Sequence, residues 1–536
     1  MARTIVAQNL KALLTDGGEI ALVDPREEGI FGKRHMLVAT NIPLSRFELE
    51  MRDLIPRLST RVVLCDAGGG EAKAAAALMD AAGYTDLAIL EGGIEAWAQA
   101  GGELYSGVYV PSKAFGEFVE IRTHTPNITC EELKAKLDAG EKVVVLDSRP
   151  FDEFHAMNIP GGIDTPGAEL VYRLRDLAPD PDTLVVVNCA GRTRSIIGCQ
   201  SLVNAGAPNK VMALRNGTMG WHLAGFELEQ GSQRQCGPVS PEALDWAQSA
   251  AEGVARRFGV QRIGLETLAR WQAVSDVRSL YLLDVRYLEE YEAGHLPGSR
   301  PAPGGQLVQS TDRYVGTRNA RIVLIDDTGV RATMTASWLV QMGWRDVAVL
   351  EGGLDAVALE CGPYRPEPPE LGALDVPVMT VDALAERLSA GRVAVIDLAD
   401  SLEFRVGHIP GASWAIRSRL ARALTAVDAA PEGFVVTSPD GWLARFGAAT
   451  LRSLTDMPVA ALQGGTAAWA AAGLALAKGA DRMADETVDI YYRPYDGDPQ
   501  AGELEAAMNR YLTWEVGLVE QMERDGTLVF PEFPHA

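Results

Sequence analysis

The feature that most constrains the fold of this 536-residue chain is an ordered set of three short patterns that recurs four times. The first pattern is an apolar run that ends in Asp, often as Asp-x-Arg, and its copies end at Asp24, Asp147, Asp284 and Asp397. Each copy occupies about 110–135 residues, the usual size of a domain. Self-similarity at such a period marks a tandem array, so we expect one module repeated four times rather than one large core.

The second and third patterns follow the first in every copy. The second is a proline-containing turn, which occurs at Pro43, Pro160–Gly161, Pro297–Gly298 and Pro410–Gly411. The third is a Leu-x-Gly-Gly-like element, which begins at Leu90, Leu214, Leu350 and Leu462 and is followed in three copies by Trp97, Trp221 or Trp469. The constant order of three unrelated patterns excludes chance as their origin.

Short apolar strands alternate with amphipathic helices inside each copy. In the second copy the predicted strands are residues 142–147, 185–188 and 210–214, and the predicted helical segments are residues 151–155, 195–205 and 218–225. Thr129 and Glu132 form a capping box that opens another helix. This alternation predicts an α/β fold in which a mostly parallel sheet is covered by helices on both faces.

We expect four domains and a tail. The predicted bounds are residues 1–105, 122–232, 258–362 and 376–478, followed by a helical C-terminal extension over 479–536. The linker 240–261 begins with Ser240-Pro241, an N-cap followed by proline, and is predicted to be helical. Residues 503–522 of the tail place apolar side chains largely along one helical face, which we expect to pack on the domains or on a second subunit. These side chains are Leu504, Met508, Tyr511, Leu512, Val519 and Met522.

One cysteine lies where such folds bind ligands. Cys189 ends the β-branched run 185–187, and a short loop with Gly191 and two arginines follows before a helix begins. The end of a parallel strand and the start of a helix both direct backbone N–H groups at this thiol. We therefore expect the thiolate, the nucleophilic form, to be favoured there. Cys199, in the next helix, is expected to be a core side chain.

The other copies act as internal controls for Cys189. Alignment on the helix after the loop places Cys65, Asp326 and Ser438 at the equivalent position. A carboxylate and a hydroxyl cannot act as thiolates, so the third and fourth modules are expected to be inactive. Cys65 is a candidate second thiol, but its loop has no arginine and has acidic neighbours, which raise the pKa of a thiol and repel anionic donors. We expect it to be much the weaker nucleophile.

Composition narrows the classes of partner. The formal net charge of −23 argues against nucleic acid and anionic membrane surfaces, whose phosphates bind clustered Lys and Arg. The six cysteines lie far apart without a CxxC pair, which favours a reducing compartment and argues against a disulfide framework or a zinc site. No window approaches the roughly 18 apolar residues of a membrane span, and the N-terminus has no apolar signal core. We therefore expect a cytoplasmic protein without metal or cofactor, and a homodimer stays open.

With these motifs in place, the four modules resemble rhodanese domains, and the chain is similar to multidomain thiosulfate sulfurtransferases. The resemblance covers residues 1–478 and is carried by the Asp-x-Arg strand end, the proline turn, the six-residue Cys loop and the Gly-Gly element. It implies that Cys189 forms a persulfide, taking sulfane sulfur from thiosulfate or a similar donor and passing it to cyanide or a thiol. Two departures, the residues after His155 and residues 215–217, weaken the transfer of the family's substrate preferences.

The loop chemistry assigns roles to the residues around Cys189. The active-site loop comprises Ala190, Gly191, Arg192, Thr193, Arg194 and Ser195, whose N–H groups are expected to cradle the sulfur. We expect Arg192 to face the anionic donor and Arg194 to shape the loop. Asp147 and Arg149 are expected to support the loop by ion pairing, and His155 to be structural.

Two other functions stay open at this point. Rhodanese-like scaffolds also carry phosphatase and arsenate reductase chemistry, which needs one more loop residue, Cys-x5-Arg, and here Ser195 occupies the place of that arginine. A non-enzymatic role, as a sulfur carrier or a partner-binding scaffold, fits the inactive third and fourth modules. The complete Cys189 loop favours catalysis over both.

Overall fold

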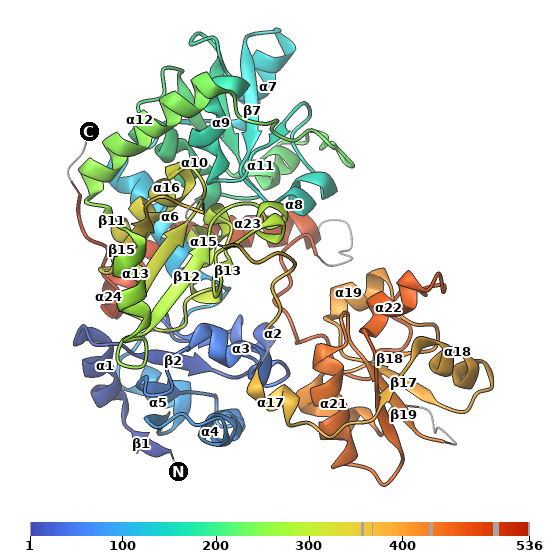
Figure 1. Cartoon of the computed structure of the whole chain (residues 1–536). Helices are drawn as coiled ribbons and strands as arrows, with labels where there is room; N and C mark the ends of the chain where they lie inside the picture. Colours follow the sequence, from blue (N-terminus) through green and yellow to red (C-terminus); the bar gives the residue numbers. More distant parts are fainter. Residues whose placement is uncertain (1, 355–357, 367, 428–431, 497–502, 534–536) are drawn as a thin grey trace.

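The computed structural model describes residues 2–354, 358–366, 368–427, 432–496 and 503–533. It contains four five-stranded sheets, one in each predicted module, and the strands within them pair in parallel. The predicted fold class is therefore confirmed. Figure 1 shows the first three modules packed together, with the fourth attached at their side.

The second module shows how each sheet is built. Its strands are β6 (Asn127–Ile128), β7 (Val143–Asp147), β8 (Ile163–Asp164), β9 (Leu184–Asn188) and β10 (Val211–Leu214), in the spatial order β6-β10-β9-β7-β8. Its helices are α7 (Cys130–Asp138), α8 (Phe151–Ala156), α9 (Glu169–Leu177), α10 (Thr193–Asn204) and α11 (Gly217–Leu223). The middle strand β9 buries Val185, Val186 and Val187 completely, because helices cover both of its faces. The predicted strands and helices of this module all occur, within one or two residues of their predicted bounds.

The other three sheets repeat this strand order. The first comprises β1 (Arg3–Ile5), β2 (Ala21–Asp24), β3 (Thr40–Asn41), β4 (Val62–Leu64) and β5 (Leu87–Leu90). The third comprises β11 (Gln261–Ile263), β12 (Leu280–Asp284), β13 (Arg300–Pro301), β14 (Arg321–Ile325) and β15 (Val347–Leu350). The fourth comprises β16 (Val378–Met379), β17 (Ala394–Asp397), β18 (Ser413–Trp414), β19 (Phe434–Thr437) and β20 (Val459–Leu462). A residue at the end of β9 therefore has counterparts at the ends of β4, β14 and β19.

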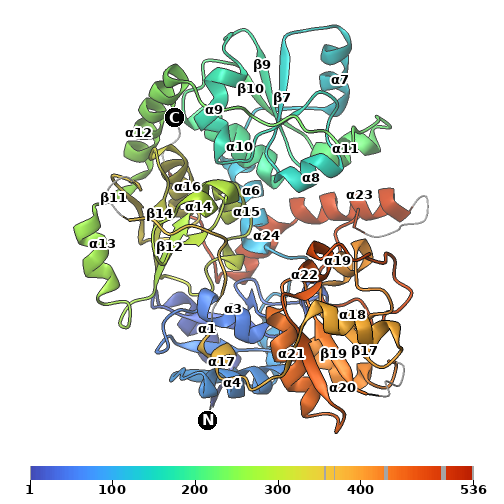
Figure 2. The same ribbon diagram turned by 45° about the vertical axis from the view of Figure 1, so that its right-hand side comes forward.

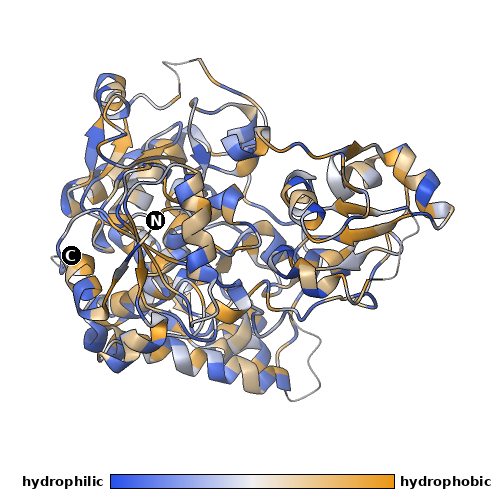
Figure 3. Cartoon of the chain, turned by 90° about the horizontal axis from the view of Figure 1, so that it is seen from below, coloured by the Kyte–Doolittle hydropathy of each residue, from blue (hydrophilic) through white to orange (hydrophobic). Residues whose placement is uncertain are grey.

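Helices cover these sheets as well. The first module has α1 (Ala7–Thr15), α2 (Glu28–Phe31), α3 (Phe47–Leu54), α4 (Glu71–Ala81) and α5 (Gly93–Gln99). The third has α13 (Leu265–Gln272), α14 (Leu288–Ala293), α15 (Gly304–Gln309), the 3-10 turn η1 (Thr311–Arg313) and α16 (Val330–Gln341). The fourth has α18 (Val381–Ser389), α19 (Ser401–Val406), the 3-10 turn η2 (Arg417–Arg419), α20 (Leu420–Ala423), α21 (Trp442–Arg452) and α22 (Gly465–Ala471). In Figure 3 the strands are mainly hydrophobic and the helices carry both hydrophobic and hydrophilic residues, as expected for helices between a sheet and solvent.

The linkers contain helices of their own. The predicted helix after Ser240 is confirmed as α12 (Pro241–Phe258), with the Ser240 hydroxyl accepting a hydrogen bond from the N–H of Ala243 over 3.2 Å. The third linker contains the short α17 (Pro369–Gly372). The first linker forms α6 (Val110–Thr123), which the sequence does not predict. Helix α6 packs against α10, and Phe115 joins a core shared by the first and third modules.

The tail is helical, as predicted, but as two helices rather than one. These are α23 (Glu503–Val516) and α24 (Leu518–Asp525), separated at Gly517. Met508 and Leu512 of α23 pack on Ala190 of the Cys189 loop, and α24 packs against α6. Figure 2 shows α23 running beneath the second module. Within the described ranges, no helix combines the length and apolar character needed to cross a membrane.

Candidate functional site

Each module places one side chain at the carboxyl end of its middle strand. Cys65 follows β4, Cys189 follows β9, Asp326 follows β14 and Ser438 follows β19, and all four side chains are buried. A loop then leads into α4, α10, α16 or α21, so that N–H groups at a helix N-terminus lie near each side chain. The four positions are structural equivalents that differ in chemistry.

The third and fourth modules show which loop N–H groups face this position. The Asp326 carboxylate accepts hydrogen bonds from the N–H groups of Gly329 (2.8 Å) and Ala332 (3.2 Å), three and six residues later. The Ser438 hydroxyl accepts hydrogen bonds from the same two loop positions, over 3.1 and 3.2 Å. In both modules, a side-chain oxygen of the loop itself therefore occupies these N–H groups.

In the second module the same two N–H groups belong to Arg192 and Ser195. Among the described residues, the backbone N–H groups of residues 190–195 donate to no oxygen atom. The Cys189 loop therefore presents N–H donors that no protein oxygen occupies, and the N–H of Ser195 is directed at the sulfur. Such a concave set of donors at a helix N-terminus suits an anion.

In the first module, the residue after the cysteine occupies the N–H groups of the loop. The carboxylate of Asp66 accepts hydrogen bonds from the N–H groups of Gly68 (2.8 Å), Gly70 (3.1 Å) and Ala72 (3.0 Å). Burial raises the pKa of the neighbouring Cys65 thiol well above its ordinary value, and nearby carboxylates raise it further. The loop around Cys65 therefore already holds an anion of its own.

The protonation of Cys189 differs from the expectation. The side chain is only 2 % exposed, and burial raises the pKa of its thiol. The charge of Arg194 and the hydroxyl and N–H of Ser195 lower this pKa, whereas the carboxylate of Glu515 raises it. The loop groups therefore favour the thiolate, but the loss of hydration outweighs them, so the net shift of the Cys189 pKa is upward, against the expectation.

Arg194 holds the loop against α8. Its Nη1 and Nη2 atoms donate to Glu153 over 3.1 and 2.8 Å, and Nη1 also lies 3.3 Å from the Gln306 side-chain oxygen. Burial would raise the pKa of Glu153, but Arg194 brings it down to about 2. The third module repeats this pair, since Arg331 and Glu290 occupy the equivalent positions and bind each other.

Arg192 is directed at the first linker. Its Nε and Nη2 atoms each donate to the Glu117 carboxylate over 2.7 Å, Nη2 also pairs with Glu120, and Nη1 lies 3.3 Å from Asn216 Oδ1. These contacts use four of the five guanidinium N–H groups and set two carboxylates against one charge. These contacts argue against the expectation that Arg192 faces the anionic donor.

The predicted supporting residues lie beneath the loop. Asp147 and Arg149 form a buried ion pair with Nη2 2.8 Å from Oδ2, and Asn188 Nδ2 donates to the same oxygen over 2.8 Å. His155 is half-buried, and its Nδ1 lies 3.1 Å from the carbonyl oxygen of Ser232. The hydrogen bond from Asn188 to Asp147 joins the ends of β9 and β7 directly before the Cys189 loop, and the ion pair with Arg149 holds the Asp147 carboxylate in place.

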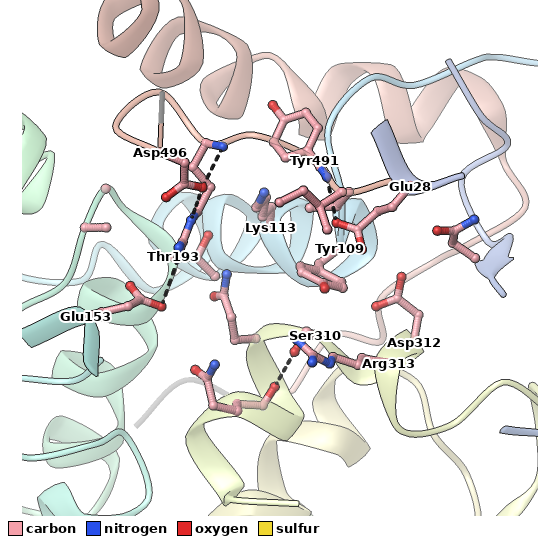
Figure 4. Close-up of a pocket in the computed structure, with 18 of the residues that line it drawn as sticks. Glu28, Tyr109, Lys113, Glu153, Thr193, Ser310, Asp312, Arg313, Tyr491 and Asp496 are labelled. Carbon is pink, nitrogen blue, oxygen red and sulfur yellow. Dashed lines mark hydrogen bonds and ion pairs between the residues drawn. The ribbon is translucent and has the colours of Figure 1, made fainter. Parts of the chain in front are cut away.

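A cavity of about 690 Å³ opens over the Cys189 loop and is bordered by all four modules, the first linker and the tail (Figure 4). Besides the loop, the lining includes Glu28, Arg46, Tyr109, Lys113, Glu153, Met219, Asp312, Arg313, Asp400, Tyr491, Arg493, Tyr495, Asp496, Tyr511 and Glu515. Figure 4 shows Tyr109, which directly precedes α6, Lys113 of α6, and Tyr491 and Asp496 of the tail around the same space as Thr193. The thiol is thus reached from a cavity between the modules.

Several lining residues lie outside the predicted site. Lys113, Tyr491 and Glu515 belong to the linker and the tail, where no repeat pattern marks them. Tyr511 is predicted only as part of the apolar face of a helix, yet its hydroxyl donates to Glu515 Oε1 over 3.1 Å. The one signal that the sequence offers is this polar pair four residues apart on an otherwise apolar face.

Comparisons with known proteins account for the modules. The family model described as a rhodanese-like domain matches residues 6–100, 129–224, 266–360 and 380–472. A crystal structure of a thiosulfate sulfurtransferase from Pseudomonas aeruginosa is 49% identical, with a TM-score of 0.93 over 99% of this chain and 100% of that one. The four matched segments contain the Cys189 loop and its counterparts but neither α6 nor α23.

Two curated relatives match smaller parts of the chain. Thiosulfate sulfurtransferase of Azotobacter vinelandii is 31% identical over 189 residues, which are 28% of this chain and 70% of that protein. The HTH-type transcriptional regulator Rv0324 of Mycobacterium tuberculosis is 36% identical over 105 residues, which are 20% of this chain and 45% of that protein. The match therefore spans less than half of the regulator's length.

Proposed function

Because the chain belongs to the rhodanese family, we propose that it is a sulfurtransferase that moves sulfane sulfur from thiosulfate or a similar donor to a thiophilic acceptor through a persulfide on Cys189. The similarity to thiosulfate sulfurtransferases over the whole chain supports this class of reaction. The single observation that carries the proposal is the contrast between the four loops. Only the Cys189 loop joins a thiol to N–H donors that no protein oxygen occupies.

In the first half of the reaction, the Cys189 sulfur attacks the outer sulfur of thiosulfate. A bond forms between these two sulfur atoms, the sulfur–sulfur bond of thiosulfate breaks, and sulfite leaves with its electron pair. The thiol proton is lost before the attack, since the thiolate is the nucleophile. The N–H groups of Arg192 and Ser195, with the charge of Arg194, would stabilise the negative sulfur.

In the second half, the acceptor attacks the outer sulfur of the persulfide. Its electron pair forms the new bond, the bond to Cys189 breaks, and the thiolate is regenerated. Cyanide would leave as thiocyanate, and a thiol would leave as a persulfide. The site favours acceptors that are small or that present a narrow chain end, because Cys189 is almost fully buried at the cavity.

The alternatives weighed from the sequence receive less support. Phosphatase or arsenate reductase chemistry needs an arginine where Ser195 stands. For a scaffold role, the third and fourth modules would have to present surfaces of their own, whereas Asp312, Arg313 and Asp400 from these modules border the cavity at Cys189. We infer that the modules without a thiol help to build the site.

Intact mass after incubation with thiosulfate tests the proposal. The wild type and Cys65→Ser are expected to gain one sulfur atom, and Cys189→Ser is expected to gain none. Loss of the gain in Cys65→Ser as well would indicate a relay between the two thiols. No gain in any of the three proteins would remove thiosulfate as the donor and favour the scaffold.

A further inference from the structure

Two buried ionisable side chains, Lys113 and Glu515, border the Cys189 loop and belong to neither the repeat nor the matched domain segments. Lys113 lies on α6 in the first linker, and Glu515 lies on α23 in the tail. Lys113 is 4 % exposed and Glu515 is 2 % exposed. Burying charged groups is unfavourable unless they are paired, so their role needs an explanation.

The Glu515 carboxyl group points at the Cys189 loop. Its Oε1 atom accepts the hydrogen bond of the Tyr511 hydroxyl, whereas Oε2 is buried and has no hydrogen-bond partner in the described part of the chain. A Cβ atom placed on Gly191, two residues after Cys189, would lie only 3.2 Å from Oε2. The unpartnered oxygen therefore faces the loop at close range.

Lys113 supplies a positive charge near Glu515. Its Nζ lies 5.2 Å from the centre of the Tyr511 ring and 5.1 Å from that of Trp514. It forms no ion pair with any carboxylate of the residues that the structure describes. Lys113 lines the cavity, and Figure 4 shows it between Tyr491, Tyr109 and Thr193. An ammonium held by aromatic rings keeps its N–H groups available for a ligand.

We propose that Lys113 and Glu515 form the subsite that binds the oxyanion end of the sulfur donor beside Cys189. The ammonium attracts the dianion, and a neutral carboxyl group donates its O–H to a donor oxygen. An ionised carboxylate at the same place would repel the donor. This inference rests on the proposed function, because it assigns the donor to the Cys189 cavity.

The titration of the two groups agrees with this geometry. Burial raises the pKa of Glu515 to about 7, against the opposing charge of Lys113. Burial lowers the pKa of Lys113 to about 8, against the opposing charge of Glu515. The other groups that face this pair are Glu117, Arg192, Arg194, Asp312, Tyr491, Arg493 and Tyr511. A bound dianion favours the protonated form of both groups, so donor binding takes up a proton near pH 7 and weakens as the pH rises through 7 and 8.

Glu153 offers a contrast inside the same cavity. Its ion pair with Arg194 holds its pKa at about 2, so it carries a negative charge at every pH of interest. Glu515 has no such hydrogen-bonded guanidinium among the described residues, and burial dominates its pKa. Burial raises the pKa of Asp312 in the same cavity to about 7 as well, but Glu515 is the residue whose unpartnered oxygen lies beside Gly191 of the loop. The proposal falls on Glu515 for that reason.

Thiosulfate binding to the full chain tests the proposal without turnover. The background is Cys189→Ala, and affinity is measured by isothermal titration between pH 6 and pH 9, in two buffers of different ionisation heat. The affinity is expected to fall about tenfold per pH unit above pH 7, with uptake of one proton near pH 7. Adding Glu515→Gln should abolish the uptake and flatten the profile near pH 7. Adding Lys113→Met should weaken binding at least about tenfold at pH 6.

Matched controls are the exposed Glu503 on the same helix and the exposed Lys73 in the first module. Glu503→Gln and Lys73→Met should behave as the background does. Binding without proton uptake in the background protein overturns the proposal, whether or not the variants fold. An unchanged pH profile in Glu515→Gln, or no thiosulfate binding at all, overturns it too. A wild type that gains sulfur on Cys189 while these binding tests fail would leave the proposed function standing and refute this subsite alone.

Discussion

Arg192 Nε donates to Glu117 Oε1 over 2.7 Å, which joins the Cys189 loop to helix α6 of the first linker. The two side chains are 75 positions apart in the sequence and belong to different segments of the chain. The sequence predicts that Arg192 faces the sulfur donor. In the structure, Arg192 instead binds helix α6 of the first linker. The linker in turn places Lys113 in the cavity, so the loop and α6 form one unit.

The first prediction concerns Arg194. Its charge lowers the pKa of the Cys189 thiol, so Arg194→Ala should raise that pKa and slow alkylation of Cys189. We expect the rate with iodoacetamide at pH 7.5 to fall about tenfold, which corresponds to one pKa unit. Peptide mass spectrometry resolves the modified cysteine.

The matched control is Arg215→Ala, which removes an exposed arginine of the same module. Its alkylation rate should equal that of the wild type. If Arg194→Ala left the rate–pH profile of Cys189 unchanged, the electrostatic role of Arg194 would be refuted.

The second prediction concerns the first module. Asp66 occupies the loop N–H groups and its charge helps to raise the pKa of Cys65. Asp66→Asn should therefore speed alkylation of Cys65 several-fold, by roughly half to one pKa unit. Cys65 should still react more slowly than Cys189, because the charge of Asp24 continues to raise its pKa, whereas Arg194 and Ser195 lower the pKa of Cys189. Glu91→Gln, an exposed change in the same module, should have no effect, and equal rates for Asp66→Asn and the wild type would contradict the explanation.

Much of this fold and part of its site follow from the sequence. Three patterns in fixed order predict four parallel sheets, and Cys189 lies at the end of β9 because strand and loop are local features. The direction of the Cys189 pKa could not be predicted, because it depends on burial by segments far away in the chain. The same holds for the partner of Arg192 and for the place of Glu515, which are set by how α6 and α23 pack. The position of a residue within its module can be predicted from the sequence of that module. The burial of its side chain and its ion-pair partners depend on how all the modules, the linker and the tail pack together.

The third prediction concerns Asp164 on the edge strand β8. Burial and the charge of Asp147 raise the pKa of Asp164 to about 8, and its Oδ1 has no hydrogen-bond partner among the described residues. The folded protein thus holds this proton up to about pH 8, whereas the unfolded chain releases it near pH 4. Stability should therefore fall as the pH rises across this window, since the native state binds the extra proton.

Asp164→Asn removes that proton and its pH dependence. We expect the Tm of the wild type to fall between pH 5 and pH 8.5 by roughly 2–8 °C more than the Tm of Asp164→Asn. Asp152→Asn, at an exposed position of the same module, should follow the wild type. Parallel Tm curves for Asp164→Asn and the wild type would show that Asp164 ionises normally in the folded protein.

The last prediction compares two glycines of the second module that both have positive φ. Gly217 has a φ of 55°, and a Cβ there would lie 2.2 Å from the carbonyl oxygen of Cys189. Gly206 has a φ of 70°, and a Cβ there would meet no atom within 4 Å. Alanine at either position bears the left-handed backbone strain, about 1 kcal/mol, but only at Gly217 must the Cys189 loop move to make room for the Cβ atom.

We expect Gly217→Ala to slow persulfide formation from thiosulfate at least about tenfold, since displacements of about 1 Å misplace reacting groups. Gly206→Ala should lower the Tm slightly and leave that rate unchanged. Equal rates of sulfur uptake in both variants, measured by intact mass over time, would mean that the position of the Cys189 carbonyl does not control the loop, and the importance of the loop geometry would have to be abandoned.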